Sequence, residues 1–459
     1  MENLKQNKMA VLPVNKLMLS MGIPMVLSMV LQALYNIVDS AFVSNMATGG
    51  EEALNALTLA FPMQMLMVAI SIGTGVGANA LISKSLGQGN TEKASKAAGN
   101  AAFMAILISA AFLLFGAFGA EAYIRTQTEN GVILDMGVRY LRICAMVSFG
   151  IVFFSVYEKL LQSGGHSVYS TIAQISGAVV NIILDPILIY GLLGCPEMGV
   201  AGAAWATVIG QIVSFLLAFL FHIKVNKSIS SKPLYLIPSW RVIREMYAVG
   251  LPAIIAQALM SLMTYGLNVI LGGISEAMVT AYGLYYKIQQ FLLFAAFGLR
   301  DAITPIISFA QGMGSKQRIH DGIKYGMKYT LVIMALGLAA IEAFANPFAG
   351  MFGLSGETES LCIGAMRIVS LCFVFAGANI AFQGVFQALD GGMESLAVSL
   401  CRQLIFLFPL VLLFAEIAKG NPAMTWTVWT AFPICELLSC VVAVLLCRRI
   451  LKNKVNPLG

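Results

Sequence analysis

Long apolar runs recur along the whole chain, separated by short polar stretches. The runs predict twelve spans, at residues 17–43, 55–83, 94–117, 136–160, 168–193, 200–222, 246–273, 278–310, 322–346, 362–388, 394–416 and 424–447. A helix of about 20 residues crosses the roughly 30 Å of bilayer hydrocarbon. The runs are continuous, whereas strands of a membrane β-barrel alternate apolar and polar residues. The pattern predicts an all-α polytopic membrane protein with about twelve transmembrane helices.

The composition agrees with this fold class. Hydrophobic residues make up 59% of the 459 residues and charged residues only 11%, against about 25% charged in a typical soluble domain. The polar start and the long first apolar run argue against a cleaved signal peptide. The eight cysteines form no CxxC pair, so we predict no disulfide, no cysteine metal site and no cofactor.

The placement of charge predicts the topology. Lysines and arginines gather before the first span, in the even-numbered loops and after the last span, and Lys159 is counted with the fourth loop. The odd-numbered loops carry mainly acids, such as Glu121 and Glu276. By the positive-inside rule, both termini are cytoplasmic. We therefore predict a multi-pass protein of the cytoplasmic (inner) membrane.

Internal similarity divides the chain into two halves. Gly22-Ile-Pro24 matches Gly250-Leu-Pro252, and Gly87-Gln-Gly89 matches Gly312-Met-Gly314 at an offset of 312 − 87 = 225. Leu141-Arg-Ile143 matches Met366-Arg-Ile368, and Gln162 with Gly164-Gly165 is matched to Gln387 with Gly391-Gly392. We predict an N-terminal lobe (1–222), a cytoplasmic loop (223–245) and a C-terminal lobe (246–459). Because each lobe has an even number of spans, the pseudo-twofold axis lies along the membrane normal, with the substrate path between lobes.

Acids inside the apolar runs are the main candidates for chemistry. The first span holds Asn36 and Asp39, and the fifth holds Asn181 and Asp185 on one helical face at a matching depth. Two carboxylates in an apolar site do not both stay ionised unless a cation lies between them. We therefore predict a proton-binding site, or a sodium site at Asp39, Asn181 and Asp185 with Asn36 and Thr207 as further oxygen ligands. The alternative is that each acid caps a loop or satisfies a buried polar network.

Other features of the spans fit a ligand cavity and bendable helices. Flexible methionines and aromatic residues suit a cavity for many apolar ligands, although methionine is also ordinary lipid-facing filler. The predicted cavity residues are Met29, Gln32, Tyr35, Met63, Gln257, Met260 and Tyr285. Pro24 and Pro252, in the first turns of equivalent helices, are predicted bend points. Gly73, Gly75 and Gly77 predict close helix packing.

Five further charges lie at membrane depth: Lys287, Arg300, Asp301, Arg402 and Glu436. Internal ion pairs and contact with substrate are both open for them. The chain contains no GxxxxGK[ST], HExxH or GxSxG motif, which argues against a built-in ATPase and a hydrolase. We predict that the protein is not an enzyme.

Several of these stretches together resemble the multidrug and toxic compound extrusion (MATE) family. They are GIP and YNIVDSAFVS in the first span, GVGANALISKSLGQGN, LQSGGHS, NIILDPILIYG and GVAGAAWATVIG. The resemblance covers nearly the full chain. It implies efflux of cationic or amphipathic compounds by alternating access, driven by inward H+ or Na+.

The resemblance also implies where coupling occurs. In one bacterial and archaeal branch the positions equivalent to Asp39, Asn181, Asp185 and Thr207 bind the coupling ion. A second branch uses an acid in the seventh span, where this sequence offers only Gln257. We expect small-molecule substrates, contact with membrane lipid, no nucleic acid and a monomer.

Two other functions stay open. A flippase for a lipid-linked or polysaccharide precursor, from the same superfamily, would need a larger and more cationic path. A non-transport receptor or polytopic enzyme is disfavoured by the repeat and by the missing catalytic motifs.

Overall fold

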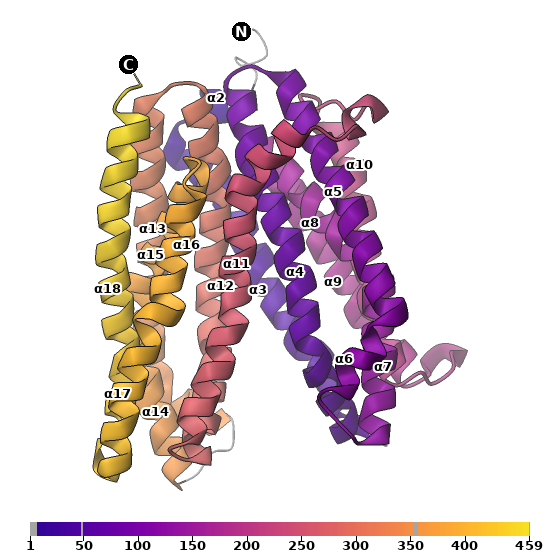
Figure 1. The fold of residues 1–459 in the computed structure, drawn as a ribbon, viewed down its shortest axis with the longest axis vertical. Helices are drawn as coiled ribbons and strands as arrows, with labels where there is room; N and C mark the ends of the chain where they lie inside the picture. Colours follow the sequence, from indigo (N-terminus) through magenta and orange to yellow (C-terminus); the bar gives the residue numbers. More distant parts are fainter. Residues whose placement is uncertain (1–6, 47–48, 352–355, 459) are drawn as a thin grey trace. The chain divides into compact units, whose positions relative to one another are not determined.

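The computed structural model describes residues 7–46, 49–351 and 356–458, apart from the side chains of 35–37, 39, 40, 44, 51, 349–351 and 357. The described residues fold into helices and form no strand (Figure 1). Ten helices in this part of the chain are long and apolar enough to cross a membrane, or twelve when two bent pairs each count as one span. The predicted all-α polytopic fold is confirmed.

The chain forms two compact units, which differ from simple N- and C-terminal halves. Unit 1 comprises Met1–Val11 and Leu31–Ile254, and unit 2 comprises Leu12–Val30 and Ile255–Gly459. Relative to the predicted lobes, the units exchange the beginnings of two equivalent helices. The first part of the first span, as far as Val30, belongs to unit 2, and the start of the seventh, as far as Ile254, belongs to unit 1.

Unit 1 is built from the N-terminal helices. They are α2 (Lys8–Val11), α3 (Val14–Ser44) from Leu31 onward, α4 (Gly50–Gly87), α5 (Thr91–Phe118), α6 (Ala120–Arg125), α7 (Gly131–Met146), α8 (Phe149–Ser163), α9 (Ser167–Ile189), η1 (Leu192–Gly194), α10 (Val200–Val225), η2 (Pro233–Leu236) and α11 (Trp240–Gly272) as far as Ile254. One apolar core joins α4, α7 and α10, and a smaller one joins α8, α9 and α10.

Unit 2 holds the first part of α3, the rest of α11, and the C-terminal helices. These are α12 (Glu276–Gly312), α13 (Lys316–Met351), α14 (Gly356–Ser370), α15 (Phe373–Ala388), α16 (Gly392–Leu400), η3 (Cys401–Ile405), α17 (Leu407–Gly420), η4 (Pro422–Met424), α18 (Thr427–Ile450) and η5 (Leu451–Val455). Its core contains Tyr282, Phe373 and Trp429. Both η3 and η5 are π-helical turns.

The fourth and tenth predicted spans are not straight helices. Each consists of two helices joined at a sharp bend, of 45° between α7 and α8 and of 51° between α14 and α15. Neither break contains the proline or glycine that usually marks a kink; the residues are Val147-Ser148 and Leu371-Cys372. Hydropathy alone therefore predicted one continuous span at each place.

The repeat is visible in matching hydrogen bonds. Ser83 Oγ donates to the Ser163 carbonyl at 3.3 Å, and Ser308 Oγ donates to the Ala388 carbonyl at 3.1 Å, with both partners displaced by 308 − 83 = 225 residues. The turns after α8 and α15 follow the same offset, because Gly165 and Asp390 both have positive φ. The sequence match of Gly164-Gly165 to Gly391-Gly392 was therefore wrong by two residues.

Glycines explain how the exchanged segments pack. In unit 1, a Cβ on Gly73 or Gly77 of α4 would collide with the start of α11, at Ile254 and Met246. In unit 2, a Cβ on Gly298 of α12 would lie 2.7 Å from the backbone of Val26 in α3. The predicted close packing at Gly73 and Gly77 is confirmed, and it is repeated in the second half. Small residues let membrane helices approach backbone to backbone.

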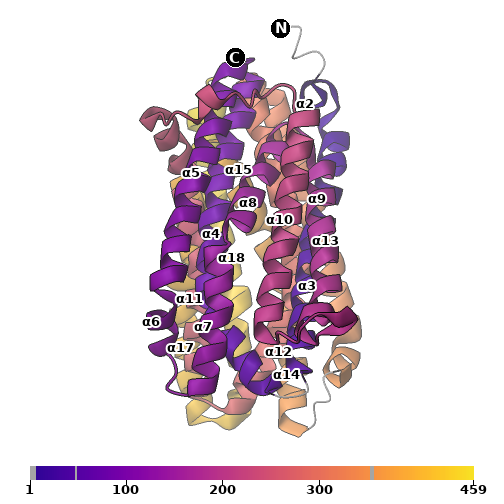
Figure 2. The ribbon, with the colours of Figure 1, turned by 90° about the vertical axis from the view of Figure 1, so that its right-hand side faces the viewer.

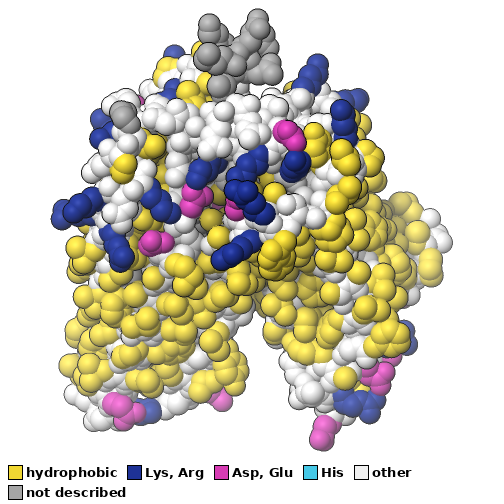
Figure 3. Space-filling model, turned by 45° about the horizontal axis from the view of Figure 1, so that its top comes forward, with side chains coloured by type: hydrophobic (Ala, Val, Ile, Leu, Met, Phe, Trp, Pro, Cys, Tyr) yellow, Lys and Arg dark blue, Asp and Glu magenta, His cyan; other side chains and the backbone are white. Residues whose placement is uncertain are grey.

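The surface separates charge from apolar area. In Figure 3, most Lys and Arg side chains lie in the upper part of the view, and hydrophobic side chains cover much of the surface below them. This distribution is the one expected for helices that pass through hydrocarbon and end in water.

Candidate coupling site in unit 1

Helices α9 and α10 approach closely because glycines line their contact. They run side by side in unit 1 (Figure 2). A Cβ on Gly177 would collide with Gly210 and Ser214, and a Cβ on Gly202 would lie 2.5 Å from the Leu188 carbonyl. The two contacts lie on either side of Asn181 and Asp185 along α9. They hold the polar side chains of the two helices within reach of each other.

Three of the predicted site residues meet at this contact. Asp185 is completely buried and Asn181 is 3% exposed. Asn181 Nδ2 lies 3.5 Å from both Asp185 Oδ1 and Thr207 Oγ1, the outer limit for a hydrogen bond. The Asn181 Oδ1 atom is buried and accepts no hydrogen bond from any described residue. The arrangement therefore presents a carboxylate, an amide oxygen and a hydroxyl that a proton or a small cation can bind.

The outer part of α3 is fixed to α9 at two levels. Gln174 Nε2 donates to Gln32 Oε1 at 3.0 Å, and Tyr190 Oη donates to the Phe42 carbonyl at 2.6 Å. Asn36 and Asp39 lie between Gln32 and Phe42 on α3, just as Asn181 and Asp185 lie between Gln174 and Tyr190 on α9. The backbone register thus agrees with the predicted depth match. The side chains of Tyr35, Asn36 and Asp39 lie outside the described residues.

Tyr190 and Gln174 were missed from the sequence. Tyr190 follows the last residue of α9, and burial, followed by the charge of Asp185, raises the pKa of its phenol. It lies five residues beyond Asp185, so helical spacing does not place the two on one face. The sequence carried no signal for this contact, because a tyrosine at a span end usually reads as an interfacial anchor.

Known proteins resemble this chain in both sequence and fold. The family model described as MatE matches residues 24–187 and 252–413, which is most of both halves. The chain belongs to the MatE family. Among curated relatives, this family member is 23% identical over 441 residues to the multidrug export protein MepA of Staphylococcus saprophyticus, covering 96% of each chain. It is 22% identical to MepA of Staphylococcus aureus, over 95% of each chain.

Solved structures give the same fold. One is an outward-facing multidrug resistance MATE family transporter of the MOP superfamily, with a TM-score of 0.89, 24% identity, and coverage of 97% of this chain and 98% of that one. Another is a MOP superfamily transporter from Pyrococcus furiosus, with a TM-score of 0.87, 25% identity and the same coverage. For that transporter, a reversed polarity of the binding pocket suggests a different function.

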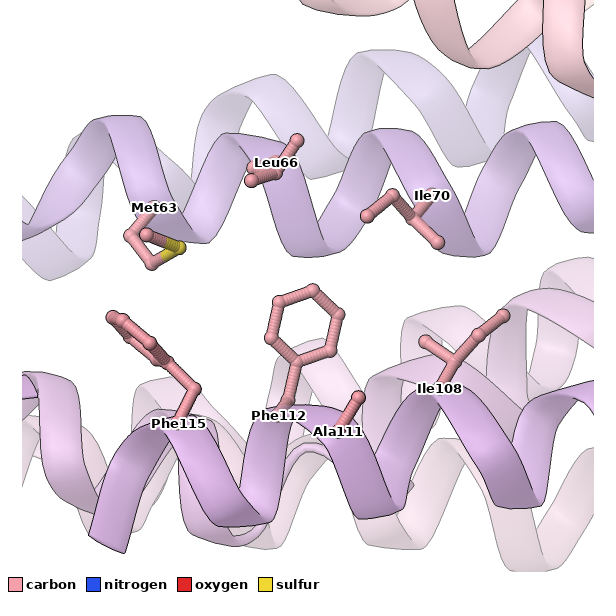
Figure 4. A pocket seen from close by; sticks show the side chains of 7 residues that line it. All are labelled: Met63, Leu66, Ile70, Ile108, Ala111, Phe112 and Phe115. Atoms are coloured by element: carbon pink, nitrogen blue, oxygen red, sulfur yellow. The ribbon is translucent and has the colours of Figure 1, made fainter. Parts of the chain in front are cut away.

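The predicted cavity residues of this MatE family member lie in different surroundings. Met63 lines an apolar pocket of about 320 Å³ with Leu66, Ile70, Ile108, Ala111, Phe112 and Phe115. Figure 4 shows Phe112 and Phe115 of α5 pointing toward the α4 helix that carries Met63, Leu66 and Ile70. Met29, Gln257 and Met260 are partly buried, and they belong to unit 2. Gln32 is held by Gln174, so its role includes joining α3 to α9.

Three predictions about unit 2 and the prolines need correction. Tyr285 is fully buried in the apolar core of unit 2 and lines no surface cavity. Pro24 and Pro252 lie inside α3 and α11 and not in their first turns, since these helices begin at Val14 and Trp240. Each still removes one backbone hydrogen bond, and each lies within a few residues of the point where its helix passes from one unit to the other.

The charges at membrane depth are mostly engaged inside their own unit. Lys159, assigned to a loop from sequence, is 1% exposed inside α8 and donates to Gln162 Oε1 at 3.0 Å. Arg300 and Asp301 form an ion pair of 2.9 Å. Arg402 and Glu436 form another, of 2.8 Å. Lys287, in contrast, is exposed on α12.

Proposed function

We propose that the protein is a secondary active exporter of cationic or amphipathic compounds, driven by inward movement of H+ or Na+ through alternating access. The observation that carries the proposal is the group of buried Asn181 and Asp185 with partly buried Thr207, on helices joined to α3 by hydrogen bonds, in a chain of the MatE family. The export activity named for the MepA relatives supports it. In this proposal the protein is not an enzyme.

The chemistry of the site supports ion coupling. A fully buried carboxylate is costly in hydrocarbon unless it is protonated or bound to a cation. The second acid, Asp39, is at a matching backbone level on α3, so one ion serves two carboxylates. When the ion binds, the repulsion between the carboxylates is relieved and α3 can adopt a different packing against α9. Pro24 lowers the cost of that bend, because its helix already lacks one hydrogen bond.

The proposal also covers the membrane location of the protein, its substrate pocket and its oligomeric state. Because lysines and arginines gather before the first span, in the even-numbered loops and after the last span, we assign both termini to the cytoplasm and the protein to the cytoplasmic membrane. Met63 and the apolar pocket between α4 and α5 suit the alkyl or aromatic part of a small-molecule substrate. The protein is proposed to work as a monomer, without cofactor or nucleic acid.

The test is efflux of a fluorescent cationic dye from proteoliposomes, under an imposed proton gradient and, separately, a sodium gradient. Wild type is compared with Asp39→Asn and Asp185→Asn, and Asp135→Asn serves as control because that acid is exposed and pairs with Arg139 at the surface. Transport driven by one gradient, lost in both site variants and kept in the control, is the expected result. Equal transport by the site variants would refute coupling at this site.

A flippase for a lipid-linked precursor is the second candidate. Lys287 supports it, as an exposed cation at membrane depth on α12. The pairing of Arg300 and Arg402 with acids of unit 2 weakens it, because paired cations offer less charge to a polyanionic headgroup. Headgroup accessibility of a labelled lipid phosphate in the same vesicles distinguishes the two functions.

A further inference from the structure

Unit 2 contains a buried row of polar side chains that the proposed function does not use. Three residues of α15, at intervals of four, each face a polar partner across the helix contact. Asn379 Nδ2 donates to Glu436 Oε2 at 2.7 Å, Gln383 Nε2 to Ser399 Oγ at 3.1 Å, and Gln387 Nε2 to Ser395 Oγ at 3.4 Å. We call these three pairs the polar ladder. All its members except Glu436 are at most 5% exposed.

The polar ladder ends at a charge in the middle of the span. Arg402 binds both oxygens of Glu436 through Nε and Nη2, at 2.8 to 3.0 Å. Arg402 lies ten residues after Gly392, the first residue of α16, which is about 15 Å along a helix and half of the hydrocarbon thickness. Its segment is the π-helical turn η3. Such turns inside α-helices are frequent at functional sites.

The other end of the polar ladder reaches the surface of unit 2. Gln387 precedes the last residue of α15, and the following turn at Leu389 and Asp390 binds Lys454 Nζ at 2.8 and 3.0 Å through its carbonyls. Asp390 is exposed. The row therefore runs from a water-facing turn to a carboxylate at mid-membrane depth.

Unused hydrogen-bonding capacity along the row indicates water. Asn379 Oδ1 and Gln387 Oε1 are buried and accept no hydrogen bond from any described residue, and the same holds for Tyr285 Oη, which lies within electrostatic reach of Glu436. Orphaned buried polar atoms are rare and usually bind an internal water. Successive pairs lie four residues apart, or about 6 Å, and one water making two hydrogen bonds of about 2.8 Å spans that distance.

We propose that the polar ladder is a hydrated proton route from the Lys454 end of unit 2 to Glu436, which binds the proton. Protons pass along waters held by the amides and serines, and one adds to a Glu436 oxygen that then gives up a hydrogen bond from Arg402 or Asn379. The charged and titratable groups facing Glu436 are Arg402, Tyr285, Cys372, Cys435 and Cys440. Only Arg402 among them is charged at neutral pH, so protonation changes the cluster from neutral to positive.

Protonation at Glu436 is tested in the full-length protein by infrared difference spectra over a pH titration. The carbonyl stretch of a protonated carboxyl should be present in wild type and absent from Arg402→Met/Glu436→Gln, which removes both charges together and so avoids a lone buried ion. A spectrum unchanged by the double substitution would overturn the assignment. This measurement needs no transport, so it decides the proposal even if drug export fails.

The route itself is tested by proton uptake in vesicles that contain a pH-sensitive dye. Gln383→Leu should slow uptake at least about tenfold, since interrupted proton transfer typically costs more than that. Gln317→Leu, the same substitution at an exposed position of α13, should not. If Gln383→Leu lowers the melting temperature but leaves uptake unchanged, the polar ladder only holds helices together and the proposal is wrong.

Discussion

Corresponding helix pairs in the two units each carry a buried polar cluster, but the clusters differ in chemistry. On α9 and α10, unit 1 places Asn181, Asp185 and Thr207. On the equivalent helices, unit 2 places Arg402 and Glu436 as an ion pair. With the offset of 225, Arg402 corresponds to Gly177 (402 − 225), one turn from Asn181 along α9.

The difference shows how a duplicated fold can separate two tasks. Gly177 lets α9 and α10 touch, and the resulting site has oxygen ligands but no guanidinium within it. Arg402 at the same repeat position neutralises the acid and holds it with fixed hydrogen bonds. In the proposed function, the cluster without a fixed cation exchanges ions, whereas Arg402 and Glu436 together form a neutral pair. The fold is shared, and differences at several equivalent positions change the electrostatics: Gly177 against Arg402, Asp185 against Leu410 and Gln211 against Glu436.

A second pair of equivalent positions also differs between the two units, at a contact between a cation and a glycine. Lys159 of α8 packs against Gly75 of α4, whereas Arg300 of α12 packs against Gly384 of α15. These positions are related by the same offset, since 300 − 75 and 384 − 159 both equal 225. Each unit therefore buries one cation at this contact, supplied by opposite helices. What the repeat preserves is a large cationic side chain facing a glycine.

The largest expected effect comes from breaking the ion pair of unit 2. Arg402→Met leaves Glu436 without its cation and should cost about 3–5 kcal/mol of unfolding free energy, whereas Arg402→Met/Glu436→Gln should recover most of it. Asp185→Asn in unit 1 should cost less than about 1 kcal/mol, because the amide keeps the size and polarity of the group. Thermal unfolding in detergent measures all three. A single variant as stable as the double would contradict the comparison.

A smaller loss of stability is expected from a substitution at Gly177, the position in unit 1 that corresponds to Arg402 in unit 2. Gly177→Ala places a methyl group against Gly210 and Ser214, and such overpacking costs about 1–3 kcal/mol. It should also reduce ion-driven dye efflux by moving Thr207 away from Asn181. Gly283→Ala is the control, because no atom lies within 4 Å of the added carbon. Loss of stability without loss of efflux would show that the α9–α10 distance does not matter for coupling.

Lowering the pH should reduce the free energy of unfolding through protonation of His166 in unit 1. The equivalent position in unit 2 is Gly391. Burial, and then the charge of Lys8, lowers the pKa of His166 from 6.5 to about 4. The histidine is thus neutral when folded, so its contribution is complete above pH 6.5, falls between 6.5 and 4, and is lost below 4. Allowing for solvent screening, the loss is about 1–2 kcal/mol. His166→Gln should make the melting temperature less dependent on pH between 4 and 6.5. A pH dependence equal to that of wild type would refute the assignment.

The smallest expected effect is at the hydrogen bond between α9 and α3. Tyr190→Phe removes the bond to the Phe42 carbonyl and should cost about 1 kcal/mol. If that bond sets the level of Asp39 against Asp185, dye efflux should fall severalfold while substrate binding stays normal. Tyr169→Phe, at an exposed ring on the same helix, is the matched control. Equal efflux by both variants would limit Tyr190 to a structural role.

The sequence predicted the features that depend on hydropathy and on repeats. The spans and the close packing at Gly73 and Gly77 follow from composition and spacing, because bilayer thickness and helix pitch fix them. The family followed from the resemblance of several motifs, and the family model matches it. The depth of Asn181 and Asp185 in the membrane was predicted from helix direction, and the structure places Asn181 near both Asp185 and Thr207. The coupling role of these residues stays a prediction.

What the sequence did not predict depends on contacts between distant segments. The bends at Val147 and Leu371 lack a local breaker, and Lys159 looks like a loop cation until the glycine opposite it is known. Tyr285 has the composition of a cavity residue, but the packing of unit 2 buries it. The ion pair of Arg402 with Glu436 joins residues 34 apart, and no periodic pattern reveals such a pair.

The exchanged helix beginnings also set an order of biosynthesis. Residues 12–30 leave the ribosome early but belong to unit 2, so they must wait in the bilayer until α12 arrives to cover them. Unit 1 has its own helices by Val225, yet the groove formed by Gly73 and Gly77 stays uncovered until Ile254 has been inserted. Neither half completes its packing before the other has begun. Separately expressed fragments, cut in the 223–245 loop, should therefore become protease-resistant only when both are made in the same cell.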